Sequence, residues 1–257
     1  MEKIKVIKIG GNIIDDTKAL NSFLESFSKL EGKKVLIHGG GKLASKLAEQ
    51  MNIPVQMVDG RRITDKATLD VITMMYAGKI SKNIVAKLQS YGCNAVGFSG
   101  ADGNSIIAEK RSVKSINYGY VGDVVEVKTD VTKLLLQNHI TICFCAISHD
   151  QNGQLLNTNA DTIASEIAIA LSKDYEVELY YSFEKSGILR NVNNSNSIIE
   201  VMKEDQYQNL KNQGIIFEGM IPKLDNCFYA LANGVKNIHL GKPDMIFDSQ
   251  IKHTIIL

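Results

Sequence analysis

Two glycine-rich turns in the sequence are candidate anion-binding sites. Gly10-Gly11 follows the apolar segment IKVIKI, and Gly39-Gly40-Gly41 follows KVLIH. Glycines between a strand and a helix let backbone N–H groups and a helix N-terminus approach an anion, because no Cβ stands in the way. Two such turns on neighbouring strands favour a phosphate-rich ligand. Neither turn fits the G-x-x-x-x-G-K-[ST] or the G-x-G-x-x-G pattern, so the sequence predicts neither an ordinary P-loop nor a dinucleotide fingerprint.

Three charged residues are candidates for chemistry at such an anion. Lys8 lies inside an apolar segment directly before Gly10-Gly11, although a lysine in a strand is also often just its solvent-facing member. Lys223, in GMIPKLD, falls in the first turn of a predicted helix, where a cation opposes the helix macrodipole unless an anion binds nearby. Asp161, in NTNAD, stands at a helix start, where it could equally be an ordinary cap.

The elements that must position these residues alternate between strands and helices. Short β-branched runs predict strands at about 4–11, 34–41, 93–100, 141–148, 177–183, 235–240 and 253–257. Apolar residues at three- and four-residue steps predict helices between them, including a long one from Thr64-Asp65 that ends at Gly92. This alternation predicts a parallel sheet covered by helices, with antiparallel hairpins inserted over about 103–127. Ligands then bind at the carboxyl ends of the strands.

Composition and charge exclude several classes of protein. The chain has 257 residues, 44% of them hydrophobic, and its 29 Lys and Arg nearly balance 28 Asp and Glu. A chain of this kind can bury a sizeable core, and it has no block of like charges to bind nucleic acid or an anionic membrane. The charged N-terminus MEKIKVIKIGGN is unlike a signal peptide, and no stretch approaches the roughly 20 apolar residues of a membrane span. We therefore expect a cytoplasmic protein whose four cysteines are buried thiols rather than disulfides or metal ligands.

Six ordered motifs resemble the amino-acid kinase superfamily, and most closely its N-acetylglutamate kinases. They are KIGGN, HGGGK, DGRRITD, YVGDV, NGQLLNTNAD and EGMIPKLD, spread from residue 8 to residue 225. The resemblance implies an α/β fold, a three-layer α/β/α sandwich with an open, mainly parallel eight-stranded sheet. It implies one domain over 1–257, with an acyl-glutamate-binding and dimerisation half over about 1–173 and a nucleotide-binding half over about 174–257.

The resemblance also implies the reaction and the role of each motif residue. The γ-phosphoryl group of ATP, accompanied by Mg²⁺, would pass to the side-chain carboxylate of N-acetyl-L-glutamate, the second step of arginine biosynthesis. Lys8 and Lys223 would neutralise the transferring phosphoryl, and Asp161 would hold both ammonium groups. The remaining positions bind phosphate (Gly10, Gly11), the acyl-glutamate (Gly40, Gly41, Arg62, Asn157) or the nucleotide (Glu184, Ser186, Gly187, Phe217). No protein metal-ligand cluster is expected, and no general base is needed because the acceptor carboxylate is already ionised at neutral pH.

Three positions depart from the pattern of the family. Glu184 replaces an aspartate in the nucleotide loop SFEKSG, and His253-Thr254 stands in place of a Gly-Thr pair. Arg61 precedes Arg62 where relatives mostly have an apolar residue. A second guanidinium could pair an additional carboxylate, such as that of an N-succinyl group. Because adjacent residues in an extended segment point opposite ways, a surface position for Arg61 is the favoured interpretation.

Other members of the superfamily and an inactive relative are the competing interpretations. Aspartokinases and glutamate 5-kinases usually carry additional modules, and carbamate and uridylate kinases lack the combination of GRRITD and NTNAD. A catalytically dead amino-acid sensor would not need Lys8, Asp161 and Lys223 together. The chain starts at its first predicted strand, without the helical extension of arginine-inhibited hexamers. We therefore expect a homodimer without arginine feedback.

Overall fold

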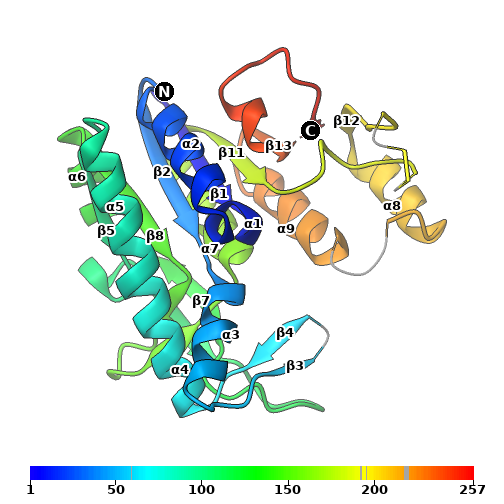
Figure 1. Ribbon diagram of the computed structural model, residues 1–257. Coiled ribbons are helices and arrows are strands. Elements are labelled where there is room, and N and C mark those ends of the chain that lie inside the picture. The colour runs from blue at the N-terminus through cyan, green and yellow to red at the C-terminus, as the bar shows by residue number, and fades with distance from the viewer. Residues whose placement is uncertain (59, 192, 195, 217–219) are drawn as a thin grey trace.

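An eight-stranded sheet forms the centre of the protein (Figure 1). The structure is a computed structural model that describes residues 1–58, 60–191, 193–194, 196–216 and 220–257. The strand order is β12-β14-β13-β11-β1-β2-β8-β5, and every neighbouring pair is parallel except β13 with β14. The strands are β1 Lys3–Ile9, β2 Lys33–His38, β5 Ala95–Phe98, β8 Thr141–Cys145, β11 Glu176–Ser182, β12 Val201–Met202, β13 Asn237–Gly241 and β14 Thr254–Ile256. The predicted open, mainly parallel sheet is confirmed.

Helices cover the sheet on both faces. In Figure 1, α2 (Thr17–Ser28) and α5 (Ser81–Ser90) lie in front of the sheet, and α7 (Ala160–Leu171) and α9 (Met220–Ala232) lie behind it. The other helices are α1 Gly11–Asp15, α3 Gly41–Gln50, α4 Lys66–Thr73, α6 Asp130–Gln137 and α8 Glu204–Asn212. The apolar side chains on both faces of β1 are buried, as expected of a parallel strand between two helical layers. Among the described residues, no helix is long and apolar enough to span a membrane.

A second, four-stranded sheet lies beside the first. Its order is β10-β9-β6-β7, from β6 Ile106–Lys110, β7 Gly122–Val127, β9 Ile147–His149 and β10 Leu155–Asn157. The antiparallel β6–β7 pair confirms the hairpin predicted in this region. The single strand predicted over 141–148 is wrong, because β8 joins the main sheet and β9 joins the second one. The residues on both sides of the break, Cys143–Cys145 and Ile147, are apolar and buried, so no change of pattern marks the break.

The long predicted helix is confirmed, but its middle turns are widened. It consists of α4, a π-helical segment η1 (Met74–Ile80) and α5, which form one continuous rod in Figure 1. Asp65 caps it as expected, since its carboxylate accepts a hydrogen bond from Thr68 N at 2.7 Å. The buried residues of the π-helical segment, Met75, Tyr76 and Ile80, continue the apolar stripe of the flanking helices, so the sequence predicted only one uninterrupted helix. Tyr76 and Ile80 of this segment pack against Gly40.

The hairpin that carries Arg62 was not predicted. Its strands, β3 Gln56–Val58 and β4 Arg61–Ile63, are three residues long and largely exposed, so they show no apolar alternation.

The four cysteines are free and buried, as expected.

Candidate active site

Both glycine turns open at the same edge of the main sheet. The parallel neighbours β1 and β2 end side by side, and α1 and α3 begin directly after them. Gly10 and Gly40 are the N-terminal cap residues of these helices, and neither cap makes a side-chain hydrogen bond. The edge predicted to bind a ligand therefore presents backbone N–H groups from two turns.

Lys8, Asp161 and Lys223 converge at this edge. They come from β1, the start of α7 and the start of α9, so the contact joins segments far apart in the sequence. Lys8 Nζ lies 2.7 Å from Asp161 Oδ1, and Lys223 Nζ donates a hydrogen bond to Asp161 Oδ2. Their side chains are only 15%, 19% and 14% exposed. The structure thus brings together the two cations and the carboxylate as expected.

Asp161 is free for this contact because another residue caps its helix. The Asn159 Oδ1 atom accepts hydrogen bonds from Asp161 N at 2.8 Å and Thr162 N at 3.2 Å. The alternative that Asp161 is an ordinary cap is therefore wrong. Its carboxylate points instead to the two lysines.

The electrostatics of the three groups favour a bound anion. Burial alone would raise the pKa of Asp161, but the ammonium charges of Lys8 and Lys223 and their hydrogen bonds outweigh it and hold that pKa below 3.8. Burial lowers the pKa of Lys8 below 10.5; Asp161 works against this lowering and Lys223 adds to it. With Asp161 ionised, two ammonium groups and one carboxylate leave one positive charge uncompensated. An anion at this place lowers the cost of burying that charge.

Tyr181, a residue that the sequence analysis missed, supports the cluster from β11. Its hydroxyl donates to Asp161 O at 3.0 Å and pairs with Ser165 Oγ at 2.6 Å. Lys223 Nζ lies 4.9 Å from the centre of its ring, a distance suited to a cation–π contact. The available signal was a tyrosine inside the buried strand VELYYSF, because a buried hydroxyl needs a hydrogen-bond partner.

Arg62 and Asn157 lie around the second glycine turn. Arg62 Nη2 donates to Gly41 O at 3.0 Å and to Ser45 Oγ at 2.8 Å. Asn157 Nδ2 donates to Thr64 Oγ1 at 3.0 Å, which ties β10 to the residues that follow β4. Three of the residues expected to bind the acyl-glutamate are therefore connected through β4 and the residue after it, namely Gly41, Arg62 and Asn157.

Arg61, next to Arg62 in the hairpin, is exposed. It lines a surface hollow together with Arg111 and Lys114, whereas Arg62 contacts α3. This is the surface position that the sequence analysis favoured.

Close backbone contacts explain two of the glycines. Gly40 has φ = 144°, and a Cβ on it would collide with Ile80 Cδ1. A Cβ on Gly10 would lie 2.9 Å from Ser182 O on β11. Any larger residue would push these turns out of position.

The expected nucleotide residues follow β11 at the same edge. Glu184 is exposed, Ser186 is half-buried and Gly187 is buried. A Cβ on Gly187 would lie only 2.7 Å from Thr254 Oγ1, so a larger residue does not fit at this position. No contact of these three with the lysine pair is seen in the described chain, but the preceding Phe183 has its ring centre 6.0 Å from Lys223 Nζ. Phe217 lies outside the described residues.

Both residues of the unusual His253-Thr254 pair make hydrogen bonds within the fold. The Thr254 hydroxyl accepts from Ile188 N at 2.8 Å and donates to Ile199 O at 2.7 Å, so it connects the segment after β11 to the segment before β12. His253 Nε2 lies 2.9 Å from His239 Nδ1 on β13.

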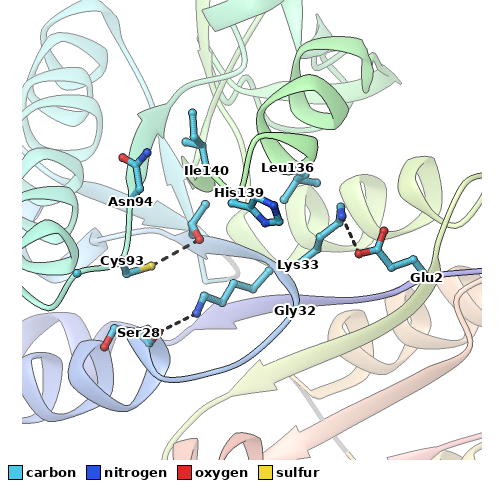
Figure 2. Close-up of a pocket in the computed structure, with 12 residues that line it drawn as sticks. Glu2, Ser28, Gly32, Lys33, Cys93, Asn94, Leu136, His139 and Ile140 are labelled. Carbon is cyan, nitrogen blue, oxygen red and sulfur yellow. Dashed lines mark hydrogen bonds and ion pairs between the residues drawn. The ribbon is translucent and has the colours of Figure 1, made fainter.

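A separate pocket lies at the opposite end of the strands (Figure 2). Its volume is about 360 Å³, and residues before β1, β2 and β8 line it. Lys33 pairs with Glu2 at 2.6 Å, and Lys34 Nζ donates to three carbonyl oxygens at the end of α2, those of Phe27, Ser28 and Leu30. The ammonium groups of Lys33 and Lys34 are thus already paired with other groups of the protein.

Comparison with known proteins places this arrangement in a family. Residues 3–242 match the family described as "Amino acid kinase family". The acetylglutamate kinase of Cytophaga hutchinsonii is 50% identical over 249 residues, covering 96% of this chain and 94% of that protein. The acetylglutamate kinase of Parabacteroides distasonis is 46% identical, covering 96% and 100%. The crystal structure of smu.665 from Streptococcus mutans superposes with a TM-score of 0.81 at 27% identity, covering 98% of each chain. As its motifs predicted, the chain belongs to the amino acid kinase family.

Proposed function

We propose that the chain transfers the γ-phosphoryl group of ATP to the side-chain carboxylate of N-acetyl-L-glutamate. The products are ADP and an acyl phosphate, the second step of arginine biosynthesis. The convergence of Lys8 and Lys223 on Asp161 beside two glycine turns carries this proposal. The 50% identity to an acetylglutamate kinase supports the choice of acceptor, and neither an N-succinyl acceptor nor a sensor role is favoured.

The geometry suits a direct transfer without an enzyme-bound intermediate. An oxygen of the acceptor carboxylate attacks the γ-phosphorus, and the bond from that phosphorus to the bridging oxygen breaks. Its electron pair stays on the β-phosphate of ADP. No proton moves, because the acceptor is already ionised. Charge spreads over the equatorial oxygens in the transition state, and Lys8 and Lys223 neutralise it.

Each remaining site residue has a binding role in this proposal. Gly10 and Gly11 present backbone N–H groups to the phosphates, and Gly40 and Gly41 present theirs to the acceptor. Arg62 forms a bidentate pair of hydrogen bonds with the substrate α-carboxylate, and Asn157 binds the acyl amide. Acyl-glutamate binding falls to about residues 1–173 and nucleotide binding to about 174–257, where Glu184, Ser186 and Gly187 form the loop and Phe217 is a further contact.

We expect Mg²⁺ to enter with ATP, where it would neutralise part of the charge of the phosphates. Asp161 is an unsuitable direct ligand while it pairs with two lysines. Within the described residues, no group of three or more His, Cys, Asp or Glu is placed to hold a metal ion. We expect the nucleotide itself to be the principal holder of the ion.

We further propose a cytoplasmic homodimer. The four free thiols fit a reducing compartment. At one end of the sheet, β5 pairs only with β8 among the described strands, and its sequence Ala-Val-Gly-Phe has neither charge nor proline to block pairing with a second strand. A two-fold axis beside β5 would cover this edge.

Acyl phosphate formation tests the function directly. Purified protein is incubated with Mg²⁺-ATP and N-acetyl-L-glutamate, and the acyl phosphate is trapped with hydroxylamine. We expect a hydroxamate with this acceptor, and none from a Lys8→Ala variant prepared in parallel. Absence of product from the parent protein at millimolar substrate would contradict the proposal. Product that persists in Lys8→Ala would point to a contaminating kinase or to a different site.

A further inference from the structure

Lys42, in the motif HGGGK, has no role in the site described above. It follows Gly41 in the first turn of α3, and its side chain is 68% exposed. A cation there opposes the positive end of the helix macrodipole. Its position costs stability unless another group offsets the charge.

The ammonium group of Lys42 connects the two glycine turns. Nζ donates to Asn12 Oδ1 at 2.9 Å and lies 3.7 Å from Asp15 Oδ2. Asn12 and Asp15 are three residues apart on α1, which begins directly after Gly10, and α1 contacts α3. Lys42 is thus held between the segment that follows β1 and the segment that follows β2.

Asp15 brings negative charge into a region suited to anions. Both of its carboxylate oxygens are buried, and neither accepts a hydrogen bond from the described part of the chain. Oδ2 lies 3.7 Å from the position that a Cβ on Gly11 would occupy. A carboxylate so close to Gly11 repels phosphate, and the repulsion is strong where water is scarce. The nearby Lys42 offsets this charge.

Resting on the proposed function, we propose that Lys42 is a third cation of the phosphoryl transfer. It exchanges Asn12 and Asp15 for the γ-phosphoryl oxygens when both substrates are bound. Its flexible, exposed side chain allows this exchange without movement of the backbone. Lys42 keeps its protons and forms no covalent bond; it stabilises charge that grows as the phosphorus leaves ADP. Asp15 is then a positioning residue, which holds the ammonium beside the glycine turns before the substrates arrive.

Lys42→Met in the full chain tests this role, with Lys46→Met as a matched control. Lys46 lies one turn further along α3 and is also exposed. Removing one transition-state contact should lower kcat about 10- to 100-fold in Lys42→Met, while KM for each substrate changes less than about threefold. Lys42→Arg should keep most of the activity, and Lys46→Met should match the parent.

Asp15→Asn supplies a second measurement that a purely structural role would not reproduce. If Asp15 acts through Lys42, the substitution lowers kcat in the parent but has no further effect in Lys42→Met. Additive losses in the double variant would overturn the positioning role.

Two outcomes distinguish this inference from the proposed function. A parent that makes acyl phosphate, with a Lys42→Met variant as fast as Lys46→Met, would overturn the role of Lys42 alone. A parent that makes no acyl phosphate would overturn both.

Discussion

At the scale of single residues, one carboxylate supplies the counter-charge of two lysines. Asp161→Asn keeps the shape of the side chain but leaves Lys8 and Lys223 without a counter-charge. We expect kcat to fall about 10²- to 10³-fold, because both cations lose their positions. The thermal midpoint, measured in parallel, should also fall, since breaking a buried ion pair costs about 3–5 kcal/mol.

The same substitution has a predicted signature in the pH profile. Lys8 must be protonated to work, so activity is present below its pKa and is lost as pH rises through it. Burial already lowers this pKa below 10.5, and the charge of Asp161 acts to raise it. In Asp161→Asn the alkaline limb of kcat/KM should therefore move to lower pH. If Asp161→Asn is folded and active but the alkaline limb of its kcat/KM profile is unchanged, the protonation of Lys8 does not determine that limb.

Arg62 and Arg61 provide a matched pair for substrate binding. Arg62 contacts Gly41 and Ser45, while Arg61 is exposed in the same hairpin. Lysine lacks the planar fork that grips a carboxylate. Arg62→Lys should raise KM for N-acetyl-L-glutamate about 10- to 100-fold, the equivalent of a charged hydrogen bond, with little change in KM for ATP. Arg61→Lys should leave both constants unchanged, and a larger effect at Arg61 would reverse the assignment.

The sequence predicted the three charged residues of the site better than the residues that hold the site together through contacts. Lys8, Lys223 and Asp161 stand beside glycine turns or helix starts, so their local setting was visible. Tyr181 and Ser45 act through contacts with residues distant in the sequence, Asp161 and Arg62. Local spacing carries no information about such contacts.

At the scale of elements, the widened helix fixes the second glycine turn. Gly40→Ala would place a Cβ against Ile80 and force a side chain into a backbone conformation with φ = 144°. Such strain costs at least about 2 kcal/mol, which would lower the thermal midpoint by about 4–8 °C in a domain of this size. KM for the acceptor should rise as the turn shifts.

Gly78→Ala is the control for this prediction. Gly78 lies in η1, and a Cβ there meets nothing within 4 Å. Its thermal midpoint should stay within about 2 °C of the parent, or rise slightly because alanine favours helix. Equal destabilisation at both positions would show that neither the contact with Ile80 nor the backbone conformation of Gly40 decides the outcome.

The type and order of the elements were predictable, whereas their interruptions were not. Apolar periodicity located the rod from α4 to α5 and the strands of the main sheet except the two-residue β12, which was not predicted. The break between β8 and β9 lies in one apolar run, and the β3–β4 hairpin has no apolar alternation at all. Both features depend on which sheet or helix a segment meets, which is decided by tertiary packing.

At the scale of the whole molecule, the proposed reacting centre draws on both halves of the chain. Lys8 and Asp161 come from the first half, Lys223 comes from the second, and the pairing of β1 with β11 joins the halves within one sheet. The continuous sheet, on which α7 and α9 pack, keeps the three groups together. A pair of molecules that share the β5 edge would leave this arrangement untouched, because β5 and β11 are separated by β1, β2 and β8.

The proposed dimer can be tested by mass and by hydrogen exchange. We expect a solution mass of about twice 28.3 kDa at micromolar concentration, measured by light scattering. Amides of β5 should exchange faster when dilution shifts the protein to monomers, because their outer edge then faces water. Amides of β12, at the other edge of the sheet, should exchange at the same rate at every concentration. A monomeric mass would refute the dimer. If the protein is a dimer but the exchange rate of the β5 amides does not change on dilution, the interface lies on another face.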